Sequence, residues 1–101
     1  MTPDEQKLRK QIDKGIKAKS VLDSEPFQNA FNGVRNAILE AWATSPIRDR
    51  EGQHELRLML KLMDDINGHL KKAVKDGEFA AEELKRDKTV SQRIAERLRI
   101  A

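Results

Sequence analysis

The residues best suited to chemistry are two histidines, His54 and His69, with the neighbouring carboxylates Asp64 and Asp65. Imidazoles and carboxylates bind a metal or transfer protons when several of them meet. The histidines are 15 residues apart, which is about 22 Å along a helix, so they cannot share a metal within one chain. Asp65 precedes His69 by four residues and gives one weak two-ligand face, a pattern that is also typical of a solvated charged surface. We expect no metal site.

The sequence also lacks the residue sets of common enzymes. It has no cysteine, which excludes disulfides, thiolate zinc sites and thiol nucleophiles. It contains no Ser-His-Asp arrangement, glycine-rich phosphate loop or nucleotide motif. The charged segment 48–51 is either a binding site for a partner or an ordinary helix start, where carboxylates are stabilised by the positive end of the helix dipole. We expect no catalytic residue, no cofactor and no enzymatic activity.

Basic residues are concentrated near the start of the chain, where residues 1–22 hold six Lys/Arg against three Asp/Glu. Phosphate contacts made by such residues add salt-sensitive affinity that does not depend on nucleotide sequence. No helix-turn-helix is evident, and no aromatic residues lie among the lysines to stack on bases. The same charges would equally keep a helix soluble or bind an acidic protein. The candidate nucleic-acid contacts are Lys7, Lys10, Lys14 and Lys17.

Apolar residues recur three or four positions apart, which predicts helices over about 26–44 and 47–76. Thr44-Ser45-Pro46 separates these helices, and so short a connection favours an antiparallel hairpin. Ser45 or Asp49 is the expected cap of the second helix. No strand-like alternation occurs, so the class is all-α. The predicted core residues are Phe27, Phe31, Val34, Ile38, Trp42, Leu56, Met59, Leu60, Met63, Ile66 and Leu70.

The two ends of the chain are predicted to add one helix each. Thr2-Pro3 is a good helix start and opens a basic amphipathic helix over residues 1–22. Gly77 is the expected stop of the long helix, and residues 78–101 form a C-terminal helix with a candidate break at 87–89. The predicted organisation is one domain, 1–101, with the hairpin core at 24–77.

Some apolar residues exceed what the hairpin needs. Leu58 and Leu62 fall beside the main stripe, and Ile94 and Leu98 form a stripe with Val90 near the C-terminus. Aromatic residues make up 4% of the chain and charged residues 37%, which favours thin helical packing that a second subunit or another partner completes. We therefore expect Leu58, Leu62, Ile94 and Leu98 to form an interface, within the chain or between chains.

No apolar run approaches the roughly 20 residues that span a bilayer, and the N-terminus lacks the apolar core of a signal peptide. We expect no membrane partner and a cytoplasmic location.

Several segments resemble a known group of proteins. They are Phe27 with Phe31, the stretch 38–42, the turn and helix start 44–52, the stretch 56–61, and Gly77. Together they are similar, over residues 21–85, to small, largely uncharacterised helical proteins encoded by tailed phages and prophages. The resemblance implies a phage or prophage origin, a role in virion assembly, and a location in the host cytoplasm or the virion. It carries over no catalytic residues.

The sequence thus favours a non-enzymatic structural or adaptor protein that acts through helix-mediated protein contacts. Its expected partners are further copies of itself, in a homo-oligomer, or another phage or host protein. The alternative is a DNA-binding accessory protein for packaging or regulation, which would use the basic first helix. A host-takeover or toxin-neutralising protein acting by mimicry is a third hypothesis.

Overall fold

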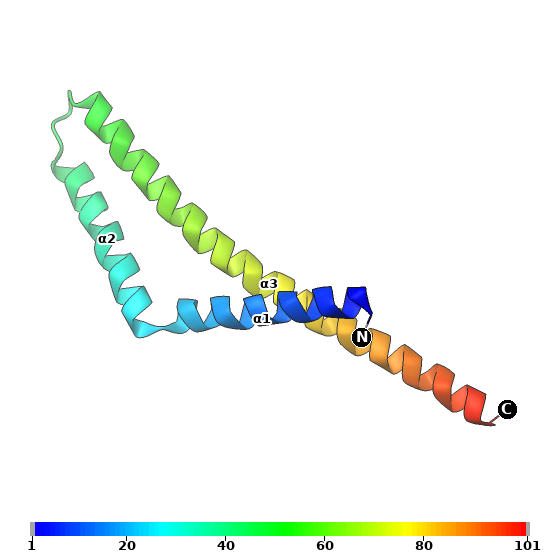
Figure 1. Ribbon diagram of the computed structural model, residues 1–101. Helices are drawn as coiled ribbons and strands as arrows, with labels where there is room; N and C mark the ends of the chain where they lie inside the picture. The colour runs from blue at the N-terminus through cyan, green and yellow to red at the C-terminus, as the bar shows by residue number, and fades with distance from the viewer. Residues whose placement is uncertain (1, 101) are drawn as a thin grey trace. The chain divides into compact units, whose positions relative to one another are not determined.

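The computed structural model describes the backbone of residues 2–100, and their side chains except those of residues 88–91 and 100. It consists of α1 (Pro3–Asp23), α2 (Glu25–Thr44) and α3 (Arg50–Ile100), as Figure 1 shows. No strand occurs between residues 2 and 100. The all-α prediction is confirmed.

Each helix begins at a polar side chain that accepts a hydrogen bond from its first turn. The Thr2 hydroxyl accepts from the Glu5 backbone N–H at 3.2 Å, and the Ser24 hydroxyl accepts from that of Phe27 at 3.2 Å. At α3 the Asp49 carboxylate accepts from the Gly52 N–H at 3.0 Å. These bonds satisfy donors that a helix start otherwise leaves unpaired. Of the two expected caps for α3, the structure uses Asp49.

The bounds of α3 differ from the prediction at both ends. The helix begins at Arg50 rather than near residue 47, because residues 46–49 form a turn in which the Asp49 N–H donates to the Pro46 carbonyl at 3.0 Å. The predicted stop at Gly77 and the candidate break at 87–89 are wrong, since α3 continues through both as one helix. Gly77 does not adopt the positive φ of a helix-ending glycine.

Backbone contacts divide the chain into two units, residues 1–18 with 72–101, and residues 19–71. We call the first the crossing unit and the second the hairpin unit. Helices α1 and α3 contribute to both.

In the crossing unit, α1 packs against α3 through small residues. A Cβ atom added to Gly15 would lie 3.0 Å from the Gly77 Cα and 3.0 Å from the Ala73 carbonyl oxygen. One added to Gly77 would lie 3.0 Å from the Gly15 Cα and 3.1 Å from the Gln11 carbonyl oxygen. Ala80, one turn further along α3, is 2% exposed. The two backbones therefore approach so closely that neither glycine position has ordinary room for a side chain.

In the hairpin unit, α2 and the first part of α3 run antiparallel on either side of the loop 45–49 (Figure 1). Ile38 is buried, and the rings of Phe27 and Phe31 stack with their centroids 5.7 Å apart. The Gln53 side chain donates to the Ser45 hydroxyl and to the Pro46 carbonyl, which fixes the loop against the start of α3. The other predicted core residues that are partly buried are Phe27, Phe31, Leu56, Leu60, Met63 and Leu70.

Four predicted core residues are exposed in the structure: Val34, Trp42, Met59 and Ile66. Trp42, expected to be among the most buried, is 40% exposed. The physical reason is that each helix of a two-helix layer covers one stripe of its partner, while residues on the flanks of a wide apolar face remain in contact with solvent. The prediction that these four residues belong to the core of the single chain is wrong.

Candidate interaction surfaces

A row of exposed apolar side chains lies on α3 in the hairpin unit. Leu58, Met59, Leu62 and Ile66 are all exposed, and Leu62 is 62% exposed. Leu58, Leu62 and Ile66 are four residues apart and Met59 is three residues before Leu62, so the four side chains lie within an arc of about 100° on one side of the helix. We call these four residues the α3 row. It contains Leu58 and Leu62, the two interface candidates in this part of the chain, and adds Met59 and Ile66, which the sequence had placed in the core.

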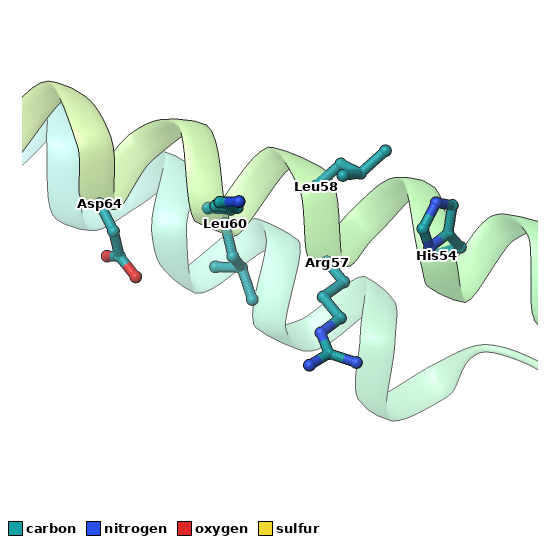
Figure 2. A pocket seen from close by; sticks show the side chains of 6 residues that line it. His54, Arg57, Leu58, Leu60 and Asp64 are labelled. Atoms are coloured by element: carbon teal, nitrogen blue, oxygen red, sulfur yellow. The ribbon is translucent and has the colours of Figure 1, made fainter.

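Figure 2 shows that side chains on this part of α3 extend in different directions. Leu60 extends toward the α2 ribbon, whereas Leu58 extends in the opposite direction. A shallow surface hollow of about 480 Å³ lies beside them, lined by His54, Arg57, Leu58, Leu60, Lys61 and Asp64.

This hollow does not assemble an acid–base pair. His54 and Asp64, ten residues apart on one helix, are separated by about 15 Å along its axis, far beyond hydrogen-bond distance. Over the described residues, no group of three His, Asp or Glu side chains is arranged to bind a metal ion. The residues considered first for chemistry, His54, His69, Asp64 and Asp65, are therefore spread along α3 rather than gathered.

The candidate nucleic-acid contacts are all on α1. Lys7, Lys10, Lys14 and Lys17 are exposed, and their spacing of three, four and three residues places them on one face. Around Lys7 this face also carries negative charge, because Lys7 lines a hollow of the crossing unit together with Asp4, Glu83 and Asp87. Asp13, which is also exposed, lies beside Lys10 and Lys17, so negative charge borders that stretch of the face as well.

The remaining interface candidates lie in the second half of α3. Ile94 and Leu98 are exposed, as is Phe79 at 72%. The Val90 side chain, which the sequence grouped with Ile94 and Leu98, lies outside the described residues. Phe79 and the two distal residues are therefore available for contacts, but on separate stretches of the helix.

Sequence reasoning missed the contact between Gly15 and Gly77. It interpreted Gly77 as a helix end and assigned no contact to Gly15. A signal was present, because Gly15 with Ala18, and Ala73 with Gly77 and Ala80, are small residues at helical spacing. Small residues repeated on one helix face permit close backbone approach, but which two helices meet is a tertiary property.

Comparison with known proteins adds no relative. The chain matches no protein-family model, no curated protein and no solved structure. None of the helices, over the residues that the structure describes, is both long and apolar enough to cross a bilayer.

Proposed function

We propose that this chain is a non-enzymatic structural or adaptor protein of a phage or prophage, and that it works by helix-mediated protein contact as an oligomer. The observation that carries the proposal is the ratio of exposed to buried apolar side chains. Among described residues, the buried hydrophobic ones are Leu8, Ala18, Ile38 and Ala80, two of which are alanines. Thirteen of the described large apolar side chains are exposed, including the whole α3 row, whereas Leu8 and Ile38 are the large ones that are buried.

Physical chemistry supports an interaction role for such a surface. Burying apolar area is the main source of stability, at about 25 cal/mol per Å², and rows of exposed large apolar residues usually mark binding surfaces. In the hollow on α3, His54 and Asp64 are too far apart to act as an acid–base pair, which favours binding over catalysis there. The resemblance of residues 21–85 to phage and prophage proteins supports virion assembly as the setting.

Static light scattering across protein concentration and salt tests the proposal. We expect a mass above that of the 11.6 kDa chain at micromolar concentration, with dissociation on dilution. High salt should preserve the assembly, because apolar contacts are not screened. A monomer at every concentration would contradict oligomerisation.

A second candidate function, DNA binding, is favoured by one observation, the exposure of Lys7, Lys10, Lys14 and Lys17 on one face of α1. If it is correct, the chain binds random duplex DNA with an affinity that falls steeply as salt rises.

The variant in which all four lysines are replaced by Gln should then lose binding. Replacing Lys71 and Lys75, which are exposed on α3, with Gln is the matched control and should reduce binding much less. Binding that does not respond to salt, or that survives the four replacements, contradicts this function.

A further inference from the structure

Three residues of the α3 row, Leu58, Leu62 and Ile66, are arranged symmetrically about Leu62, whereas Met59 has Asp65 at the corresponding position. Leu58 and Ile66 lie four residues to either side of Leu62, and Glu55 and His69 lie seven residues to either side. At 100° per residue these five side chains occupy an arc of about 80° on one face of the helix. The sequence of this face, read outward from Leu62, is therefore apolar in both directions and then polar, with an acid at one end and an imidazole at the other.

All five residues of this face are exposed. The hairpin unit covers a different side of α3, where Leu56, Leu60 and Met63 are partly buried. Leu58 extends away from α2 in Figure 2, while Leu60 extends toward it. The symmetric face is therefore the side of α3 that the hairpin leaves without a partner.

The apolar centre of this face is open to solvent. Leu58 is 48% exposed, Leu62 62% and Ile66 55%. Burial of these three side chains against a second copy would supply apolar contacts that the single chain lacks.

The polar residues at the two ends of the face favour one orientation of that second copy. In an antiparallel pair with Leu62 at the two-fold axis, Leu58 meets the partner copy's Ile66 position, and Glu55 meets its His69 position. A carboxylate and an imidazole form a favourable pair, and the symmetry produces this pair twice. A parallel pair would instead place Glu55 against Glu55, where like charges repel.

We propose that this face of α3 is a self-association site, on which two copies of the chain pack antiparallel about Leu62. The proposal rests on the oligomeric function proposed above and specifies its partner, its residues and its geometry. The interface is isologous, because each copy contributes the same surface.

Single cysteines test this geometry, since the chain has none of its own. Leu62→Cys should form a disulfide-linked dimer under mild oxidation, because residue 62 faces itself across the axis. Leu58→Cys alone should not, because the two copies of residue 58 would be about 12 Å apart along the helix, beyond the reach of a disulfide. Mixing Leu58→Cys with Ile66→Cys should give the cross-linked pair. Lys61→Cys, exposed beside Leu62, is the matched control and should stay unlinked.

A charge exchange tests the orientation independently. His69→Glu places two carboxylates together at both ends of the interface and should raise the dimer dissociation constant severalfold. The double variant Glu55→Lys with His69→Glu should restore the parental value. In a parallel pair the double variant would place like charges together and restore nothing.

The outcomes separate this inference from the oligomeric function. If the parent is an oligomer and reduced Leu62→Cys keeps the parental mass but fails to cross-link on oxidation, or if Leu58→Cys cross-links equally well, the antiparallel Leu62 site is wrong and the oligomeric function stands. If the parent is a monomer by light scattering at every concentration, both are wrong. Light scattering of reduced Leu62→Cys, with its helicity by circular dichroism, shows whether that variant keeps the parental state; a reduced variant that is folded and monomeric places Leu62 in the interface.

Discussion

At Gly15 and Gly77, the absence of a side chain on each helix allows α1 and α3 to pack closely. Each glycine costs its own helix about 1 kcal/mol relative to alanine when exposed. Their Cα positions are so close that a Cβ at either one would contact backbone of the other helix at 3.0 Å. Backbone atoms cannot rotate away as a side chain can, so the helices themselves would have to separate.

Replacing glycine with alanine inside a helix usually stabilises the protein. At these two glycines we expect the opposite, a loss of stability. Gly15→Ala and Gly77→Ala should lower the free energy of unfolding, since close packing at the crossing is lost. Gly33→Ala and Gly68→Ala, where an added Cβ meets nothing within 4 Å, should raise it by up to about 1 kcal/mol. Urea unfolding of the four variants measures the difference. Equal stabilisation in all four would show that the crossing is loose.

Ile38 and Trp42 provide a second test at the residue scale. Ile38 is 8% exposed, whereas the larger Trp42 keeps two fifths of its surface in solvent. Ile38→Ala should cost about 2–4 kcal/mol. Trp42→Ala should cost less than the 3–5 kcal/mol of a fully buried tryptophan. Chemical unfolding of both variants, followed by circular dichroism, checks this. A loss for Trp42→Ala well above that for Ile38→Ala would indicate that Trp42 is covered in solution.

At the scale of elements, the long helix α3 depends on its start and on what covers it. Its 51 residues far exceed the typical helix of 10–14 residues, and helices in water gain most of their stability from packing. The loop 45–49 fixes the beginning of α3 through the Asp49 cap and the two hydrogen bonds from Gln53. The cap determines where α3 begins, and packing against other helices determines how much of its length is stably helical.

Removal of the cap should have a local and measurable cost. Asp49→Ala leaves the Gly52 N–H without its side-chain acceptor and should destabilise the hairpin by about 1 kcal/mol. Asp49→Asn should retain most of the stability, because the amide oxygen still accepts a hydrogen bond. Asp64→Ala, at an exposed position inside α3, is the control and should be neutral or slightly stabilising. Amide hydrogen exchange in residues 50–54 would locate the effect, and unchanged protection after Asp49→Ala would contradict it.

At the scale of the whole molecule, the stability of the chain should be linked to its concentration. If folded chains associate through α3, mass action stabilises them as protein concentration rises. We expect the melting temperature to increase with concentration for the parent. Leu62→Lys should melt lower and independently of concentration, because a charge at the axis prevents association. Scanning calorimetry over a hundredfold range of concentration measures both. A parent melting temperature that does not move would contradict a coupled dimer.

Local signals predicted the helical class, the Ser-Pro turn and the starts of α1 and α2, because capping and apolar periodicity depend on residues that are near in the sequence. Periodicity also identified Leu58 and Leu62 as surplus apolar residues. It could not separate Met59 and Ile66 from the core, since a residue on the flank of a stripe has the same spacing whether or not a neighbour covers it. The four lysines of α1 were predicted as candidate surface contacts. No feature of the neighbouring sequence indicated that Lys7 would share a hollow with Glu83 and Asp87.

By itself, the sequence determined that the chain is helical, where α1 and α2 begin, and that it carries more apolar surface than a hairpin needs. Only the tertiary structure decided what the glycines do. Gly77 has the residue type of a helix end, yet α3 continues through it because α1 packs there against its bare backbone. A glycine's role depends on which atoms lie across from it, and that partner is remote in the sequence.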